Sequence, residues 1–384
     1  MTKIRTVCGD IASDTLGYTS VHEHTLFRPA TLTKAMLLGM PDMMKGITAY
    51  EGGADLGREQ ERRSHMEVVS MPQSSIGGVL TSMRMPRGNP AAKLSDLDYY
   101  TNELKAFYKA GGRALCDCSP LPTGRPLCEI AELSRRSGVK ILSCAGFYTK
   151  PMIPRRLLKG GLAALRAYLE NYMENGDSSS DARPGFVKCA VSVQQRDGIC
   201  PEELLSVRAC ALTAKKYGVS LHIHTQFPVR HAMVLQLAEL LRGEIGIDPD
   251  KVIFCHMDSY ALGNGNPTAE ICAQGYDAKF PRKLLDMGFH IGLDTWGVGK
   301  TMDLENDFGI KARRLMLQEL LADGYADKIT LGHDFMAKSN GVQNGGGGYT
   351  VFPAVLAHCV QTGELSAENL HKMTVENPAA FLAF

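Results

Sequence analysis

The chain has 384 residues, a length that fits two or three average domains or one large α/β barrel. Its formal net charge of +1 predicts no basic surface for nucleic acid or an anionic membrane, and no run of about 18 apolar residues predicts a membrane span. A hydrophobic share of 44% and a charged share of 22% exclude disordered, collagen-like and coiled-coil proteins.

Short β-rich apolar runs alternate with amphipathic stretches along the chain. Eight of these runs are predicted to be strands, at 18–24, 113–119, 139–148, 185–191, 219–225, 251–258, 289–296 and 328–335. Helices are predicted at 102–111, 127–138, 201–218, 231–243, 281–288 and 311–324. Eight strand–helix repeats predict one (β/α)8 TIM barrel over residues 1–384, with an open doubly wound sheet as the alternative.

Two stretches interrupt this alternation. Residues 28–100, rich in Met, Gly and Arg, are a long insertion after the first strand, and we expect a helical cover over the barrel mouth or an interface there. Residues 175–185 are predicted to be a polar surface loop before the fourth strand.

Cysteine usage and the amino terminus indicate the compartment. Eleven cysteines are scattered from Cys8 to Cys359 without a CxxC pair, which is not the pattern of a secreted disulfide framework. The opening MTKIRTVCGD contains no apolar stretch typical of a signal peptide. We therefore expect reduced thiols and a cytoplasmic location.

Ionisable residues gather at the carboxyl ends of the predicted strands, the rim on which barrel active sites are built. His22 and His24 are two residues apart on the first strand, so their imidazoles should face one side and Glu23 the other. Two histidines in this pattern are also consistent with polar side chains satisfied by hydrogen bonds. The remaining candidates at strand ends are Lys188, His224, His256 and Asp334.

Lys188 stands in the otherwise apolar strand GFVKCAV, where burying an ammonium is costly. A buried lysine with a lowered pKa can react with carbon dioxide to form an anionic carbamate, although a lone buried lysine more often pairs with an acid. Four imidazoles, this lysine and one carboxylate together predict two divalent metal ions. Zinc is the first candidate, with manganese, cobalt or iron as alternatives.

The opening TVCGDIASDTLGYTSVHEH resembles the start of the phosphotriesterase-like family (phosphotriesterase-related proteins) of the amidohydrolase superfamily. The likeness continues through GFVKCAV, LHIHT, FCHMD, GLDTW, LGHDF and MTVENPAAFL. The resemblance implies that His22, His24 and Asp334 bind the more buried metal and that His224 and His256 bind the more exposed one. It also implies that Lys188, as N6-carboxylysine, bridges the two ions, and that the protein forms a homodimer.

The same resemblance implies a mechanism in which a metal-bridging hydroxide attacks the substrate and Asp334 carries its proton. Tyr148 resembles the rim tyrosine of lactone-cleaving members, where it would help to polarise the carbonyl or merely pack. Efficient organophosphate hydrolases have a histidine at the position of Thr295 and an acid at Ser259, so their proton relay is missing here. Asp294 and Asp258 are expected to hydrogen-bond the ligands.

A small-molecule lactone or another carboxylic ester is therefore the expected substrate. Amide (N-acyl) hydrolysis is the alternative, organophosphate hydrolysis would be promiscuous, and a barrel that binds without turnover is the third hypothesis. Cations after the strands suggest an anionic or phosphorylated substrate: Arg230, Lys300 and Lys338, together with Lys150 and the glycine run at 344–348. Solvated lysines and a hinge explain the same residues equally well.

Overall fold

The computed structural model describes residues 2–26, 95–120, 123–192, 198–225, 231–260, 276, 278–296, 308–336 and 338–384. Nearly all of the predicted insertion, together with Arg230 and Lys300, lies outside these ranges. The expectations of a cover or an interface in the insertion therefore fall outside the described residues.

Eight parallel strands form the centre of the fold, in the spatial order β10-β9-β8-β7-β6-β5-β4-β3. Their bounds are β3 (Thr19–Glu23), β4 (Ala114–Asp117), β5 (Lys140–Gly146), β6 (Phe186–Val191), β7 (Leu221–Thr225), β8 (Val252–Cys255), β9 (His290–Leu293) and β10 (Ile329–Leu331). The Asp334 N–H donates to the His22 carbonyl at 3.0 Å and so joins the two ends of this order. The sheet is a nearly closed barrel, which confirms the predicted TIM barrel and its eight strands.

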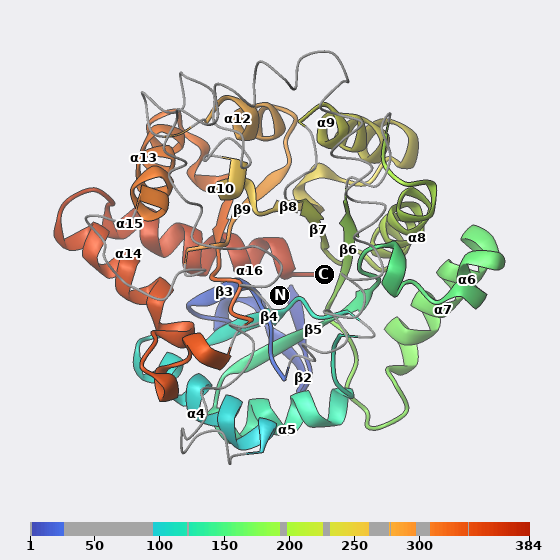
Figure 1. Ribbon diagram of the computed structural model, residues 1–384, viewed down its shortest axis with the longest axis horizontal. Coiled ribbons are helices and arrows are strands. Elements are labelled where there is room, and N and C mark those ends of the chain that lie inside the picture. The colour runs from blue at the N-terminus through green and yellow to red at the C-terminus, as the bar shows by residue number, and fades with distance from the viewer. Residues whose placement is uncertain are drawn as a thin grey trace, which may run out of the picture.

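Helices surround the barrel, as Figure 1 shows. They are α4 (Asp96–Lys109), α5 (Leu127–Ser137), α6 (Arg155–Lys159), α7 (Gly161–Asn175), α8 (Pro201–Tyr217), α9 (His231–Glu239), α10 (Met257–Tyr260), α12 (Lys279–Asp286), α13 (Phe308–Ala322), α14 (Val351–Gln361), α15 (Ala367–His371) and α16 (Asn377–Leu382). Helix α4 begins at Asp96 because the Ser95 side chain caps it by accepting the Asp98 N–H. The first residues of α4 therefore overlap the end of the predicted insertion, which was placed at approximately 28–100.

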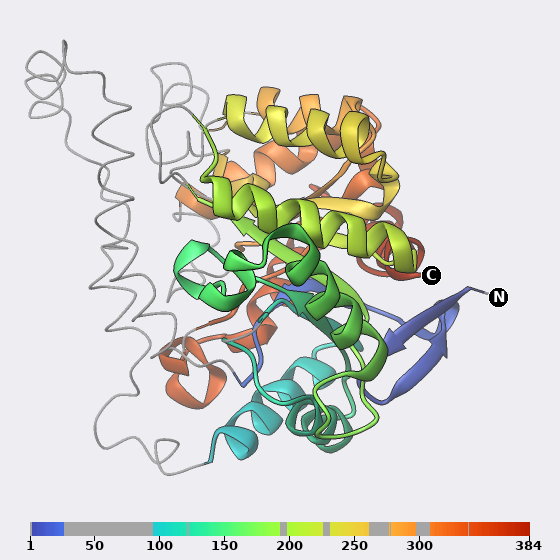
Figure 2. The same ribbon diagram turned by 90° about the vertical axis from the view of Figure 1, so that its right-hand side faces the viewer.

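A short hairpin and the carboxyl terminus lie at the end of the barrel where the strands begin. Strand β1 (Lys3–Thr6) pairs antiparallel with β2 (Gly9–Ala12), and the Val7 N–H donates to the Ile141 carbonyl near the start of β5 at 2.9 Å. The Phe384 N–H donates to the Lys3 carbonyl at 2.9 Å, and Figure 2 shows both chain ends on this side. The opposite rim, at the carboxyl ends of the strands, carries the predicted ionisable residues.

Apolar side chains fill the barrel and the layer between the barrel and the helices. Cys116 and Cys118 are fully buried on β4 and just after it, where they pack as small hydrophobic residues. The cysteines among the described residues are free thiols, as predicted. Within the same residues, no helix is long and apolar enough to cross a membrane.

The buried carboxylate of Glu203 accepts backbone N–H groups that follow two neighbouring strands at the rim. Glu203 on α8 accepts the N–H of Lys150, which follows β5, at 2.9 Å, and the N–H of Ser192, which follows β6, at 2.7 Å. The Ser192 hydroxyl donates a third hydrogen bond at 2.9 Å. Burial nevertheless outweighs these bonds and raises the pKa of Glu203 to about 7.

Because of this raised pKa, we expect the free energy of unfolding to fall as the pH rises and Glu203 ionises. The Glu203 carboxyl loses its proton near pH 4.5 in the unfolded chain and near pH 7 in the native chain. Protonated Glu203 therefore stabilises the fold fully below pH 4.5, and this stabilisation is lost as the pH rises through 7. The loss amounts to about 3 kcal/mol. Urea unfolding of wild type and Glu203→Gln between pH 4.5 and 8 should show the variant gaining relative stability across this window. A difference that does not change with pH would contradict the prediction.

Candidate metal centre

The carboxyl ends of β3 and β10 bring His22, His24 and Asp334 together. Nε2 of His24 lies 3.1 Å from Oδ1 of Asp334, and Nε2 of His22 lies 3.8 Å from the same oxygen. All three side chains are buried, and one ligand atom of each lies within 4.8 Å of the others. Two imidazoles and a carboxylate in this arrangement form a candidate site for a divalent cation.

Hydrogen bonds on the far side of each ring orient these imidazoles. Nδ1 of His22 lies 2.9 Å from Oδ2 of Asp294, and Nδ1 of His24 lies 2.8 Å from the Ser119 hydroxyl. Because a carboxylate only accepts, His22 carries its proton on Nδ1 and directs the lone pair of Nε2 toward Asp334. Ser119 was not predicted, although it is a polar residue at the end of a predicted strand.

His224 and His256, at the ends of β7 and β8, form a second imidazole pair. Nε2 of His256 lies 2.8 Å from Nδ1 of His224, and the ring centroids are 4.6 Å apart. Oδ1 of Asp294 accepts from Nδ1 of His256 at 2.7 Å, which leaves Nε2 of His256 with a lone pair. Asp294 therefore orients one imidazole in each group.

The charge states of His22 and His224 suit metal binding, whereas burial acts to lower the pKa of His256 but the Asp294 carboxylate outweighs it and raises that pKa. Burial lowers the pKa of His22 and His224 well below the ordinary value, and the neighbouring Lys188 and His256 act in the same direction. Neutral imidazole is the form that binds metals. Burial alone would raise the pKa of Asp334, but the surrounding imidazoles outweigh it and hold that pKa well below its usual range.

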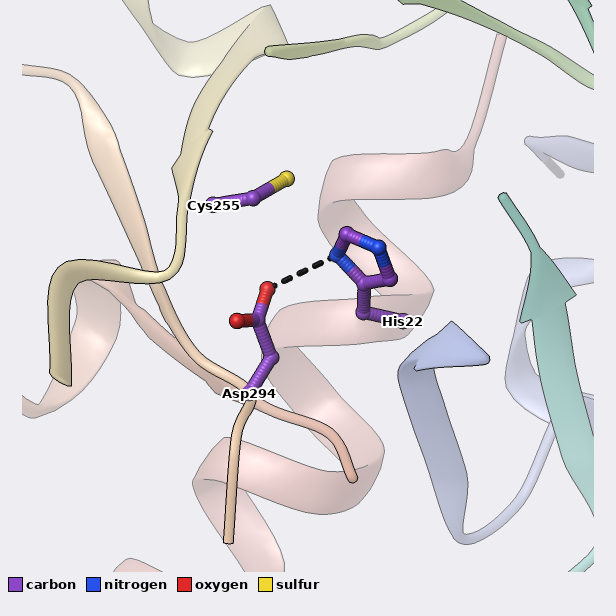
Figure 3. Close-up of side chains that lie close together, drawn as sticks. All are labelled: His22, Cys255 and Asp294. Atoms are coloured by element: carbon purple, nitrogen blue, oxygen red, sulfur yellow. Dashed lines mark hydrogen bonds and ion pairs between the residues drawn. The ribbon is translucent and has the colours of Figure 1, made fainter. Parts of the chain in front are cut away.

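Lys188 on β6 is 1% exposed, and its charge acts on imidazoles of both groups. Its Nζ is 3.4 Å from Nε2 of His22 and 3.5 Å from Sγ of Cys255. In Figure 3 the Cys255 thiol and the Asp294 carboxylate both point toward His22. Burial acts to lower the pKa of the Lys188 amine, but Cys255 and the other nearby acidic groups outweigh burial and raise it. A bound divalent cation would act in the opposite direction and lower the pKa of this amine.

These donors fit divalent cations by their chemistry. In His22, His24 and His256, Nδ1 is hydrogen-bonded to Asp294 or Ser119. Nε2 of each ring faces another proposed ligand, Asp334 or His224.

A family model, the Phosphotriesterase family, matches residues 2–382 of the chain. The chain belongs to the phosphotriesterase family. The predicted resemblance is confirmed, and the protein is a hydrolase.

Relatives in the phosphotriesterase family have several activities. The chain is 23% identical to the N-acetyltaurine hydrolase of Xenopus tropicalis over 396 residues, which cover 100% of this chain and 98% of that protein. It is 23% identical over 234 residues to an aryldialkylphosphatase of Saccharolobus solfataricus, covering 61% of this chain and 66% of that protein.

Solved structures of the family share the fold. A lactonase from Listeria monocytogenes aligns with a TM-score of 0.68 at 20% identity over 100% of this chain and 99% of that one. The phosphotriesterase homology protein of Escherichia coli, solved with phosphate in its active site, aligns with a TM-score of 0.69 at 18% identity over 96% and 99% of the two chains. At these sequence identities the structural likeness shows a shared barrel fold and does not show a shared substrate.

Tyr148 follows β5 and reaches the second imidazole pair of this phosphotriesterase-family site. Its hydroxyl lies 3.1 Å from Nε2 of His224, and the rings meet edge to face with centroids 5.0 Å apart. Burial raises the pKa of the Tyr148 phenol well above its ordinary value, so it stays protonated and can donate a hydrogen bond.

The cations predicted to bind an anionic substrate are engaged where the structure describes them. Nζ of Lys338 lies 2.5 Å from Oδ1 of Asp96 and 4.9 Å from the centroid of the Tyr99 ring. Nζ of Lys150 lies 3.1 Å from Oε1 of Glu202. Substrate binding by Arg230, Lys300 and Lys338 remains a prediction.

The loop that leads into the glycine run donates backbone N–H groups to a carboxylate of the protein itself. Glu103 on α4 accepts the N–H of Val342 at 3.0 Å and the N–H of Gln343 at 3.1 Å. The N–H groups of the run's first three residues, 344–346, donate to carbonyls of the same loop. These N–H groups are therefore satisfied by the protein and do not form a cradle for phosphate.

A buried ion pair stands where the organophosphate relay would be expected. The Thr295 hydroxyl donates to Oδ2 of Asp258 at 2.7 Å, and Nε of Arg313 donates to the same oxygen at 2.9 Å. A second guanidinium nitrogen donates to the Thr295 hydroxyl at 2.7 Å. Arg313 was not predicted, because its position on α13 carries no local signal of this contact. The group holds the end of β9 and contains no histidine.

Proposed function

We propose that this hydrolase is a lactonase or carboxylic ester hydrolase that holds two divalent ions, with zinc as the first candidate and manganese, cobalt or iron as alternatives. The proposed ligands are the donors that converge on the rim: His22, His24, Lys188, His224, His256 and Asp334. Lys188 would act as N6-carboxylysine between the two imidazole groups. The two ions would supply a hydroxide near neutral pH and polarise the substrate carbonyl.

The observation that carries this proposal is the shared Asp294 carboxylate. Its two oxygens lie 2.9 Å from Nδ1 of His22 and 2.7 Å from Nδ1 of His256. One side chain thereby sets which nitrogen is available in both imidazole groups. Such an arrangement is expected for two linked metal positions, since a pair of unrelated core histidines would not need a common acceptor.

The chain's own residues then have distinct roles in ester hydrolysis. The Asp334 carboxylate, held ionised, would accept a proton from the nucleophile and return it to the leaving group. The protonated Tyr148 hydroxyl would donate a hydrogen bond to the substrate carbonyl oxygen as negative charge develops there. The Asp258–Thr295–Arg313 group contains no histidine to pass a proton on, which supports a carbonyl substrate with organophosphate hydrolysis as a promiscuous activity.

Amide hydrolysis is the second candidate. The N-acetyltaurine hydrolases of Xenopus tropicalis and Danio rerio, whose names indicate N-acyl substrates, align over 100% of this chain. Ester and amide hydrolysis require the same attack on a carbonyl carbon, but an amide also needs a proton delivered to its nitrogen. Asp334 would make that delivery.

A parallel substrate panel separates these functions. Enzyme loaded with zinc or manganese would be assayed on lactones, aryl esters, N-acyl amines including N-acetyltaurine, and a phosphotriester. We expect the highest kcat/KM on a lactone, and a higher value on an N-acyl amine would assign the second function. Full loading with two ions and no turnover of any substrate would contradict both and indicate a binding protein.

Substitution of Tyr148 by phenylalanine tests the role of its hydroxyl. We expect kcat/KM on the best substrate to fall by about 10²-fold, the usual effect of losing one donor to a developing oxyanion. Two bound ions should remain, which metal analysis can check. Tyr217→Phe is the control, since the Tyr217 hydroxyl on α8 donates to Glu170 and Glu174 on α7 and not to a proposed ligand. Unchanged kcat/KM in Tyr148→Phe would mean that Tyr148 only packs.

We also propose that the protein acts on small molecules as a cytoplasmic homodimer without a nucleic acid or membrane partner. The free thiols and the net charge of +1 support this proposal. Analytical ultracentrifugation should give twice the mass of the 41.8 kDa chain. A monomer across the micromolar range would contradict the dimer.

A further inference from the structure

Glu23 stands between His22 and His24 in the sequence, and the proposed function gives it no task. Its side chain is 1% exposed and has donors on both carboxylate oxygens. Oε1 accepts from the Ser20 hydroxyl, and Oε2 accepts the N–H of Phe335 at 3.0 Å. Phe335 follows Asp334 at the end of β10, so Glu23 connects the first strand of the barrel to the last.

Asp334 has a backbone conformation that needs external support. Its φ is 55°, in the left-handed region that side chains with a Cβ rarely adopt. The N–H of Asp334 donates to the His22 carbonyl at 3.0 Å, and the next N–H along the chain donates to Glu23. These two N–H groups belong to the peptide planes on either side of the Asp334 Cα. Fixing both planes fixes φ and ψ of Asp334, and with them the direction of its side chain.

His256, which follows β8, shows the same combination of positive φ and a held N–H group. Its φ is 63°, and its own N–H donates to Oδ1 of Asp294 at 2.9 Å. The described residues other than glycine with positive φ are Leu26, Ser178, His256 and Asp334. Two of these are proposed metal ligands, each with a buried carboxylate holding an adjoining N–H. Strained residues persist at functional sites only where the surroundings determine their conformation, which is the case at both positions.

We propose that Glu23 is a positioning residue for the metal centre, because its carboxylate locks the peptide after Asp334 so that Asp334 faces His22 and His24. The inference rests on the proposed function for the identity of the ligands. A glutamine would keep one acceptor oxygen and place an N–H group at the other position. If this N–H faced the Phe335 N–H, the peptide after Asp334 would lose its acceptor. If it faced Ser20, the hydroxyl would have to turn and accept, and its own proton would lose Glu23 as acceptor, so the side chain that holds the peptide would be less firmly fixed.

Metal affinity in Glu23→Gln tests the inference without relying on turnover. Competition with a chromophoric chelator, using zinc, would give the dissociation constant of each ion. We expect the constant for one ion to rise by about 10–100-fold, the usual effect of losing a residue that orients a ligand. The second ion should bind as in wild type. Wild-type constants for both ions in Glu23→Gln would overturn the inference.

Glu203→Gln is the matched control. Glu203 is also a buried glutamate that accepts backbone N–H groups at strand ends, but its donors are Lys150 and Ser192, neither of which adjoins a proposed ligand. We expect it to retain both ions with unchanged constants. An equal weakening of one ion in both variants would attribute the effect to general loosening of the rim and would overturn a specific role for Glu23.

Folding and the proposed function are checked separately. Circular dichroism and thermal unfolding would establish that Glu23→Gln folds. If it does not, Ser20→Ala carries the test, because it removes one donor that fixes the carboxylate, and we expect a several-fold weakening of the same ion. Unchanged constants in Ser20→Ala would then overturn the inference. A wild-type chain that binds a single ion would contradict the binuclear proposal, and Glu23 would be tested on that ion.

Discussion

Replacing Lys188 by alanine is expected to abolish metal-dependent hydrolysis. The residue is buried, and its Nζ lies 3.4 Å from Nε2 of His22. We expect kcat/KM to fall by about 10³-fold or more, as for other residues that act as part of a catalytic unit. Metal analysis of the dialysed protein should show fewer than two ions per chain, because the bridging anion is lost.

Lys188→Arg distinguishes a carboxylated lysine from a simple cation. Arginine keeps the positive charge but does not form the carbamate, so we expect the same loss as in Lys188→Ala. Lys140→Ala is a control on the neighbouring strand β5, where the amine binds the Thr15 carbonyl at the opposite end of the barrel. Full activity with two ions in Lys188→Arg would exclude the carbamate. A labelled carbon signal after growth in ¹³C-bicarbonate would support it directly.

Asp294→Asn is expected to weaken both metal positions at once. An asparagine presents an N–H group where the carboxylate accepts, so His22 or His256 would have to accept at Nδ1 and carry its proton on Nε2, the nitrogen directed at the site. Metal affinity should fall by about 10–100-fold for each affected imidazole. The free energy of unfolding should fall by about 3–5 kcal/mol, since buried donors lose a charged acceptor.

Asp258→Asn provides the comparison for Asp294→Asn. Asp258 is an equally buried carboxylate on the adjoining strand end, but it accepts from Thr295 and Arg313 and contacts no proposed ligand. We expect a similar loss in urea stability with both ions retained. If Asp294→Asn kept wild-type affinity for both ions, the idea that one carboxylate sets the nitrogen donors of both groups would be wrong.

Carboxylates that accept backbone N–H groups recur around this rim. Glu23 holds the end of β10, Glu203 holds the ends of β5 and β6, and Asp258 accepts the Thr295 N–H at the end of β9. Parallel strands end at the rim, and the N–H groups that follow them have no neighbouring strand to pair with. Buried acceptors satisfy these groups and hold the first residues of loops around the candidate metal centre.

Parts of the fold were predictable because their signals are local. The eight strands were predictable, since each is a short apolar run that ends in polar residues. Helix α7 was not among the predicted helices, because the glycines at 160 and 161 that begin it resemble a loop, and its apolar face is weak. The start of α4 was placed too late, although Ser95 and Asp98 form a recognisable cap.

The sequence by itself determined the barrel, the family and the candidate ligands, because these residues follow directly from the end of a strand. Only the tertiary structure decided their partners. Asp294 reaches His22 across 272 residues, and Glu23 reaches Phe335 across 312. Such contacts form because β10 lies beside β3 in the closed barrel. A local sequence pattern cannot predict which side chains this closure brings into contact. From sequence position alone, Lys338 and the glycine run were expected to be available to a substrate. In the structure, Lys338 and the loop before the glycine run instead bind Asp96 and Glu103 on α4.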